Sequence, residues 1–449
     1  MKKENKNREK LIKLNAPLSN NENYNTKKIK NKNSIKNIFN RISKLNISSK
    51  GKNNIQKINP KTNELKIEKP LIQNSYAPIK KRHDGIDIAR IVAMYFLVTH
   101  HVLYHGGPMY FTKKLSYDNN LLLYLNTIFC SGVDTFGMIS GLVGFHSHKY
   151  SKLLYLLCQA FLYGYGIAYY LKLKNPKNVK DLNQFLYPVF IPNYWYFNAY
   201  FIVYFFFPFI NAGIKYLGKR EIGIFNLTLF LLFSCFNQIS HYSKRLNFDM
   251  FALNNGFTYK WLLILYFLGS YFGRFYSESH KYNIFIVFIF SSVIIGFVAY
   301  LRNLIIIYKI KNKQRYGSLR YEYTAPSSVI ISTCFISFFS KVQINSAILQ
   351  RIISLFSSVT FGIYLIHGHP LVLTRVITGR YNFLSKYHSK DLILGILFES
   401  LKVFLFCSII DFIRLVIFKI LRIRQICDLI EIIFNKILNF MIIIFEYLY

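Results

Sequence analysis

Acidic residues are scarce in this sequence, and its cysteines occur only singly. The 449 residues include 20 Asp or Glu against 57 Lys or Arg, which gives a formal net charge of +37. The six cysteines form no CxxC pair and no metal-binding spacing with histidine, which argues against a disulfide-stapled secreted scaffold and a zinc module. Hydrophobic residues make up 52% of the chain and the mean hydropathy is +0.23. This composition indicates a membrane protein.

The positive charge is concentrated before residue 83. Residues 1–82 contain 22 Lys or Arg, five Glu, no Asp, 17 Asn and three aromatic residues. Such a segment cannot bury a core, so we expect 1–82 to be a disordered, basic, Asn/Lys-rich tail. The tail lacks the apolar run of a signal peptide and is therefore expected in the cytosol. It would attract anionic lipid headgroups or serve as a solvated spacer, and nucleic-acid binding is disfavoured because stacking aromatic residues are missing.

Apolar runs recur from residue 83 onward, each of about 17 to 25 residues and long enough to cross a hydrocarbon core of about 30 Å. They predict an all-α, polytopic membrane protein with about ten transmembrane helices. The runs lie near 86–104, 121–145, 153–172, 191–210, 222–239, 258–276, 282–300, 326–341, 352–373 and 394–418. We therefore expect a membrane domain over 83–420. The last stretch, 421–449, carries spaced charges and fits an amphipathic or interfacial helix.

The direction of the crossings follows from the tail. Ten crossings return the chain to its starting side, so both termini are expected in the cytosol, with the basic segment Arg414 to Arg424 also inside. The short loops conflict with this orientation, because those assigned to the outside carry more Lys and Arg than those assigned to the inside. We give the tail more weight and expect a multi-pass membrane protein with cytosolic N- and C-termini.

Charged and polar residues inside the first span indicate a functional site. An ionisable group at bilayer depth is costly and usually faces a protein interior or a watery cavity. Arg90 and His101 are eleven positions apart, which places them on one face of a helix and about 16 Å apart along it. Arg90 would lie near the cytosolic edge and His101 deep in the membrane. His100 points about 80° away from this face and is the weaker candidate.

The second and ninth spans add further polar groups. Gly132, Gly137 and Gly141 allow close helix packing, and Asp134 and Ser140 lie among them. A buried carboxylate requires a cationic partner, and the depth of Asp134 suits either Arg90 or His101, so its partner stays open. His367, in the ninth span, is expected at the depth of His101. The alternative to a functional role for Asp134, Ser140 and His367 is that each is a buried, hydrogen-bonded residue that serves only helix packing.

Together these residues resemble the acyltransferase 3 family of integral membrane proteins, which move acyl groups, typically acetyl, onto carbohydrates and other extracytoplasmic acceptors. Arg90 with ten residues before His101 is similar to the family's Arg/Lys-x10-His signature. Gly132-Val-Asp-Thr-Phe through Ile139-Ser-Gly resembles its second-span element, and Phe361-Gly-Ile-Tyr-Leu-Ile-His resembles a later one. The sequence departs from the family after the second span, where His146-Ser-His-Lys replaces an Arg-rich turn.

The resemblance implies an enzyme that transfers an acyl group from cytosolic acyl-CoA to a hydroxyl of a lumenal or extracytoplasmic acceptor, such as a glycan. His101 would be the general base, because imidazole titrates near neutral pH. Arg90, Asp87, Asp134 and Ser140 would bind the donor or support the site, and His367 would face the acceptor. Acyl-CoA, for example acetyl-CoA, would be a co-substrate, with no metal and no permanently bound cofactor. The alternatives are a secondary transporter or flippase, and a relative without catalytic activity.

Overall fold

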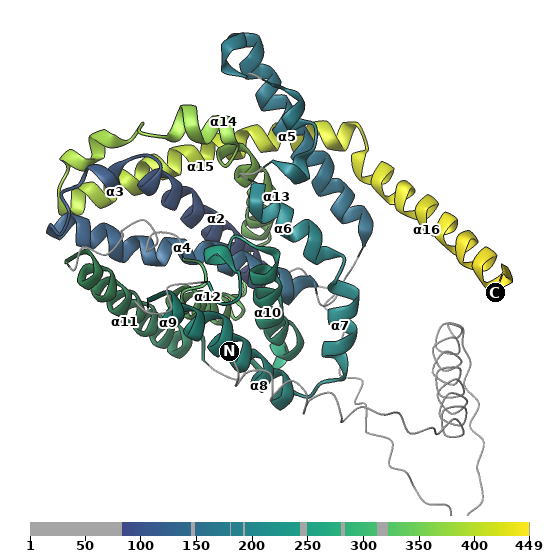
Figure 1. Ribbon diagram of the computed structural model, residues 1–449, viewed down its shortest axis with the longest axis horizontal. Coiled ribbons are helices and arrows are strands. Elements are labelled where there is room, and N and C mark those ends of the chain that lie inside the picture. The colour runs from purple at the N-terminus through teal and green to yellow at the C-terminus, as the bar shows by residue number, and fades with distance from the viewer. Residues whose placement is uncertain are drawn as a thin grey trace, which may run out of the picture. The chain divides into compact units, whose positions relative to one another are not determined.

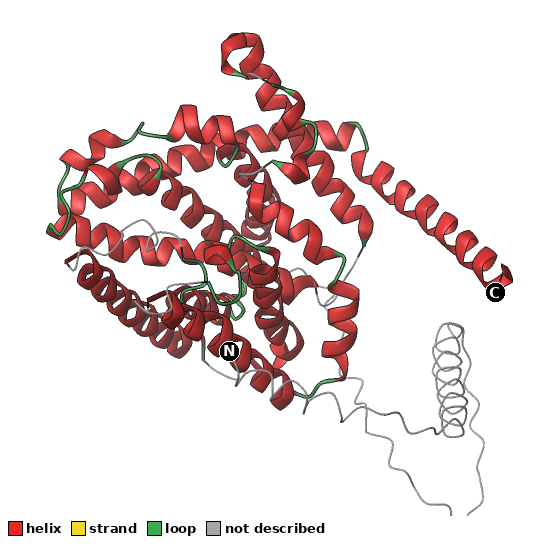
Figure 2. Ribbon diagram, viewed as in Figure 1, coloured by secondary structure: helices red, strands yellow, loops and turns green. Residues whose placement is uncertain are grey.

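The computed structural model describes residues 83–144, 149–179, 181–191, 194–242, 249–279, 283–311 and 322–448. The expected basic tail, 1–82, lies outside these residues. Figure 2 shows that the described part of the chain consists of helices joined by loops, with no strand. The all-helical class expected from the long apolar runs is confirmed.

The longer helices follow one another in the order drawn in Figure 1. They are α2 (Asp84–Tyr104), α4 (Tyr117–Gly144), α5 (Tyr150–Lys174), α6 (Trp195–Tyr204), α7 (Phe207–Tyr216), α8 (Lys219–Phe230), α10 (Tyr259–Ser279), α11 (Ile284–Lys311), α12 (Pro326–Phe339), α13 (Ala347–His367), α15 (Ser389–Ile420) and α16 (Ile423–Leu448). Short α-helices are α3 (Pro108–Phe111), α9 (Asn237–Tyr242) and α14 (Pro370–Val372). Single 3-10 turns lie at Pro176–Asn178, Asn183–Phe185, Pro188–Phe190, Asn254–Gly256 and Asn382–Lys386, and π-helical turns at Leu231–Phe236 and Leu373–Ile377.

All ten apolar runs fall on helices, but fewer than ten of these helices have the length and apolar composition of a membrane span. Six of the described segments do: α2, α4, α5, the continuous segment Lys219–Ser240, α11 and α13. The pair α6 and α7 would be a seventh span if counted as one, although it is bent by 60°. Helix α12 has only 14 residues, and α10 and α15 are not among these six. The six spans make the protein a multi-pass membrane protein.

The core is built around α4, which packs against α2, α10, α11 and α12. Glycines allow two of these contacts. A Cβ on Gly132 would lie 2.6 Å from the carbonyl oxygen of Ala93 on α2, and one on Gly269 would lie 1.8 Å from that of Met138. Any larger residue would force the helices apart. On its other side α2 packs against α13 and α15, so α2 is enclosed by helices.

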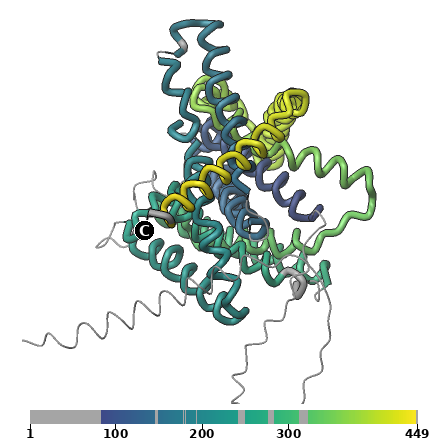
Figure 3. Tube along the Cα trace, turned by 90° about the vertical axis from the view of Figure 1, so that its right-hand side faces the viewer, coloured from purple at the N-terminus to yellow at the C-terminus, as the bar shows by residue number. Residues whose placement is uncertain are grey.

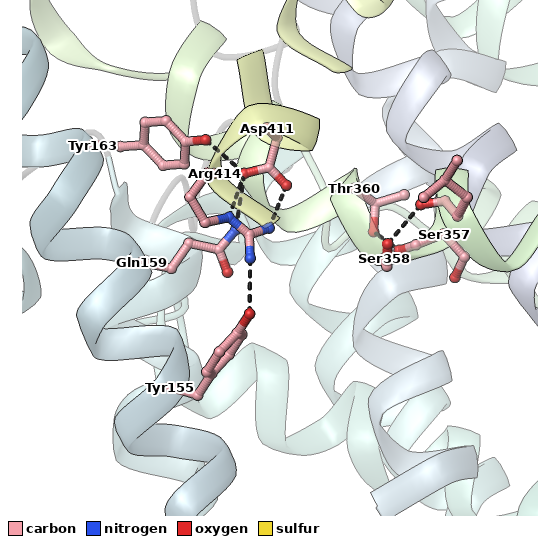
Figure 4. A network of polar contacts seen from close by, with 9 residues as sticks. Tyr155, Gln159, Tyr163, Ser357, Ser358, Thr360, Asp411 and Arg414 are labelled. Atoms are coloured by element: carbon pink, nitrogen blue, oxygen red, sulfur yellow. Dashed lines mark hydrogen bonds and ion pairs between the residues drawn. The ribbon is translucent and has the colours of Figure 1, made fainter. Parts of the chain in front are cut away.

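A buried ion pair holds α15 against α5 and α13 (Figure 4). Asp411 and Arg414, 0% and 3% exposed, pair one turn apart on α15, at 2.5 Å between Oδ2 and NH2. From α5, the Tyr163 hydroxyl donates to Asp411 Oδ1 at 2.6 Å, and Arg414 NH1 donates to the Tyr155 hydroxyl at 2.9 Å. On α13, a Cβ at Gly362 would lie 2.0 Å from the Asp411 carboxylate. The pair therefore fixes the register of three helices.

Helix α16 leaves the bundle at the C-terminal end of α15. In Figure 1 it runs out to the right, and in Figure 3, which looks from that side, it crosses in front of the other helices. Near its start the Glu431 carboxylate accepts hydrogen bonds from the backbone amides of Tyr150 and Ser151 on α5, at 2.9 and 3.1 Å. Burial opposes ionisation of Glu431, but these hydrogen bonds outweigh it and lower its pKa. The apolar side chains farther along α16 are mostly exposed.

Candidate functional site

The site is a cavity of about 700 Å³ inside the helix bundle. Its walls come from α2, α4, α6 and α13 and from the loops that lead into α10, α12 and α14. Most of the lining is aromatic or aliphatic, which is typical of a small-molecule site with a few polar groups. The aromatic lining residues are Phe136, Trp195, Tyr196, Phe257, Tyr323, Phe361 and Tyr364.

Helix α2 places His101 on the wall of this cavity. Leu97 and Met94, one and two turns before His101 on the same face, line it too. They form an apolar floor between His101 and the end of α2 that carries Arg90. The face of α2 identified from the spacing of Arg90 and His101 is thus the face on which the cavity lies.

His367, the last residue of α13, lies beside His101, although it is not among the residues that line the cavity. The two ring centroids are 5.0 Å apart. His367 Nδ1 lies 2.5 Å from the carbonyl oxygen of Ile363, and because a carbonyl only accepts, Nδ1 carries the proton. His367 Nε2 and His101 Nδ1 are buried and have no hydrogen-bond partner among the described residues. Buried nitrogens are normally satisfied, so the two rings have capacity for a substrate.

His105, one turn after His101, also lines the cavity, with its ring centroid 5.3 Å from that of His101. It lies just beyond the end of α2, and burial lowers its pKa below the ordinary value. His105 was missed by the sequence reasoning, although its spacing of four from His101 is a usable signal, since residues i and i+4 share a helix face.

His100 and His369 are placed differently. His100 points to α4, where its Nδ1 lies 2.7 Å from Asn126 Oδ1, and it is not among the lining residues. His369 uses both ring nitrogens: Nδ1 accepts from the Leu371 amide at 3.1 Å, so Nε2 donates to the Gly164 carbonyl at 3.1 Å. His369 is therefore a structural histidine in neutral form, and His100 joins α2 to α4.

Arg90 lies outside the cavity lining and pairs with Asp87. The distance between Arg90 NH1 and Asp87 Oδ1 is 2.5 Å, and the Ser357 hydroxyl of α13 donates to the same oxygen at 2.8 Å. The Asp87 side chain is 2% exposed and that of Arg90 is 26% exposed. Arg90 thus reaches the surface of the bundle while Asp87 ties α2 to α13.

Asp134 and Ser140 do not contact the histidines. Asp134 Oδ1 accepts a hydrogen bond from Trp261 Nε1 on α10 at 3.1 Å, and its Oδ2 has no partner among the described residues. The expected cationic partner, Arg90 or His101, is therefore replaced by an indole, because α10 and not α2 faces this side of α4. The Ser140 hydroxyl donates to the Phe136 carbonyl of its own helix at 3.0 Å.

The pairing of two loops at the cavity wall could not be predicted from the sequence. Asn254 and Tyr323 come from two separate loops that are joined by a backbone hydrogen bond of 3.1 Å from the Tyr323 amide to the Asn255 carbonyl. A salt bridge of 2.7 Å between Arg302 and Glu322 lies directly beside Tyr323. These contacts join segments that are far apart in the chain, so no local sequence pattern predicts them.

No group of three or more His, Cys, Asp or Glu side chains in the described ranges is arranged to hold a metal ion. The polar residues that line the cavity include His101, His105, Asn254, Thr374 and Thr378.

A bundle of membrane helices around a cavity lined by His101 and His105 defines an integral membrane protein with an internal chamber. Residues 83–410 match the family model described as an acyltransferase domain. The chain belongs to the acyltransferase 3 family. No curated protein and no solved structure matches it.

Proposed function

We propose that this protein transfers an acyl group, most simply acetyl, from cytosolic acyl-CoA to a hydroxyl of an acceptor on the opposite side of the membrane, and that the acceptor is a carbohydrate. The observation that carries the proposal is the position of His101. It lies on the cavity wall beside His367, and its Nδ1 is buried with no hydrogen-bond partner among the described residues. Membership of the acyltransferase family supports the reaction type.

In the proposed reaction His101 takes the proton of the acceptor hydroxyl as its oxygen attacks the thioester carbonyl. The tetrahedral intermediate collapses by breaking the carbon–sulfur bond, and the imidazolium returns the proton to the departing thiolate. The products are an ester and free coenzyme A, so atoms and protons balance without a metal or redox partner.

His367 would bind the acceptor. With its Nδ1 proton held by the Ile363 carbonyl, the neutral ring presents a lone pair at Nε2, which accepts a hydrogen bond from a hydroxyl. The same nitrogen cannot donate to a developing oxyanion. His367 could either orient the acceptor hydroxyl or stabilise the negative charge that develops on the carbonyl oxygen. Because Nε2 only accepts a hydrogen bond, we favour the first role.

Arg90 would bind the donor. It lies about 16 Å along α2 from His101, on the surface of the bundle, which suits a donor whose charged phosphates and reactive thioester lie at opposite ends. A guanidinium has five N–H donors, so Arg90 keeps capacity for a phosphate while it pairs with Asp87. Met94 and Leu97 would contact the part of acyl-CoA that connects its phosphates to its thioester.

The test is transfer of label from labelled acetyl-CoA to candidate glycans by purified protein, comparing His101→Gln with His100→Gln. Removing a general base typically costs about 10² to 10⁴ in rate, so His101→Gln should lose nearly all transfer. His100→Gln removes a neighbouring buried imidazole that lies off the cavity, and should lose much less. Size-exclusion profiles of the two variants establish that both are folded.

Equal losses in the two variants would contradict the role of His101. A transporter or flippase remains the second candidate, because the cavity would also hold a solute. It predicts uptake of acceptor into vesicles with no transfer of label, and that result would overturn the acyltransferase proposal.

A further inference from the structure

A second hollow lies on the outside of the bundle, between α8, α10, α11 and α12. Its volume is about 860 Å³, and it shares no lining residue with the cavity of His101. The walls are mainly aliphatic and aromatic. Among them Leu227 of α8 and Phe290 of α11 are 56% and 66% exposed. This groove therefore opens outward, toward the hydrocarbon that surrounds the membrane helices.

Two lysines line the groove, and both lie at one end of it. Lys341 follows α12 and is 9% exposed. The end of α12 adjoins the start of α2, because a Cβ on Gly85 would lie 2.0 Å from the Phe339 carbonyl oxygen and 2.7 Å from that of Val342. Lys341 is thus on the side of the bundle where α2 begins and Arg90 lies.

Lys219, the first residue of α8, lies at the same end. Its ammonium is 6.0 Å from the centroid of the Phe275 ring, which also lines the groove. The adjoining turn of α10 packs on the last turn of α4, since a Cβ on Gly273 would lie 2.5 Å from the Leu142 carbonyl oxygen. Helix α4 is antiparallel to α2, so its last turn is on the side where α2 begins.

We infer that this groove binds an anionic phospholipid, with the acyl chains along the walls of α8, α10, α11 and α12 and the phosphate between Lys219 and Lys341. The apolar walls select a lipid chain, and the two ammonium groups select a negative headgroup. Lys341 is largely shielded from water, so its attraction for an anion is weakly screened. Basic pockets between membrane helices bind anionic headgroups in this manner.

Photo-crosslinking in phosphatidylcholine vesicles tests the inference. The vesicles carry a small fraction of photoactivatable phosphatidylglycerol or, in the second arm, photoactivatable phosphatidylcholine with the same chains. Phosphatidylglycerol should label peptides of α8, α10, α11 and α12 more strongly than phosphatidylcholine. Because each lysine near the headgroups contributes about a fivefold preference, the double variant Lys219→Ala/Lys341→Ala should lose about 25-fold.

Two variants serve as controls. Lys419→Ala removes an exposed charge on α15 outside the groove, and it should keep the preference for phosphatidylglycerol. Gly223 lines the groove, and a Cβ there would meet only the Tyr271 ring at 4.0 Å. Gly223→Phe should therefore fold, fill the groove and reduce labelling by both lipids. Equal labelling by the two lipids in the natural protein, or an unchanged preference in the double lysine variant, would overturn the inference.

Discussion

At the residue scale, His369 illustrates how buried imidazoles respond to acid. It lies two residues beyond the end of α13 and is fully buried. Burial lowers its pKa to about 4, although the hydrogen bond to the Gly164 carbonyl opposes the shift. In the unfolded chain the imidazole has its ordinary pKa near 6.5. Between these two values the unfolded state binds more protons, so the stability that neutral His369 contributes is present above pH 6.5 and is lost as the pH falls toward 4.

We therefore expect the free energy of unfolding to decrease by about 2 kcal/mol between pH 7 and pH 5 on account of His369. The variant His369→Gln cannot titrate and should lose that much less on acidification, whatever its stability at pH 7. Thermal unfolding in detergent at the two pH values measures the difference. A variant with the same pH dependence as the natural protein would show that His369 is protonated in the folded state as readily as in the unfolded one.

Arg90 permits a prediction about the donor. Arg90→Lys keeps the charge but loses the planar fork, so it should retain partial transfer with a raised KM for acyl-CoA. Arg90→Ala should retain little activity. The matched control is Ser357→Ala, which removes the other partner of Asp87 and should leave the donor KM near its natural value. An unchanged donor KM in Arg90→Ala would refute the donor-binding role.

At the scale of elements, the Asp411–Arg414 pair should dominate the stability of the contact between α5, α13 and α15. Asp411→Ala leaves the Arg414 guanidinium buried without its carboxylate, which typically costs about 3 to 5 kcal/mol. Glu399→Ala, on the same helix, breaks an i,i+3 pair with Lys402, whose side chain is 54% exposed, and exposed pairs contribute at most about 1 kcal/mol. Unfolding curves of the two variants in detergent compare the effects. Similar losses would mean that the buried pair is no more important than the exposed one.

The helices themselves could be predicted from the sequence, because every apolar run is helical in the structure. The predicted count of about ten spans is not confirmed, because six of the described segments have the length and apolar composition of a span. Helix α15 shows how charged residues fit into an apolar run, because the side chains of Asp411 and Arg414 turn inward and neutralise one another. The break between α6 and α7 is not evident from hydropathy either, because the run 191–210 predicts one span and Pro208, at the start of α7, lies within it.

The candidate site was predictable where it depends on one helix and unpredictable where it depends on several. The spacing of Arg90 and His101 follows from helix geometry alone, and the structure places His101 on the cavity. The partner of Asp134 depends on which helix faces that side of α4, and neither periodicity nor charge specifies that α10 and Trp261 do. The loop residues Asn254 and Tyr323 meet only after the bundle has formed.

At the scale of the whole molecule, α15 provides a test of topology. Its 32 residues extend for about 48 Å at 1.5 Å per residue, more than the hydrocarbon core of about 30 Å. We expect its ends to lie on opposite sides of the membrane, with Lys419 cytosolic. Lys386→Cys and Lys419→Cys, each in a chain whose natural cysteines are replaced by serine, report the two ends. A membrane-impermeant maleimide should label position 386 in intact cells and position 419 only after permeabilisation.

The reverse pattern would invert the whole protein and place Arg90 on the side opposite the proposed cytosolic donor. Labelling of both positions from outside would instead mean that α15 does not cross the membrane.

The cavity volume of about 700 Å³ has a consequence for substrate tolerance. Cavities of this size hold one molecule of drug-like dimensions, so donor and acceptor would share it only through their reacting ends. The part of the acceptor remote from its reactive hydroxyl would stay outside the cavity. In a series of acceptors lengthened step by step at the end remote from the reactive hydroxyl, kcat/KM should therefore stay nearly constant. A change in the hydroxyl-bearing ring itself, the only part the walls touch, should decide whether an acceptor is used.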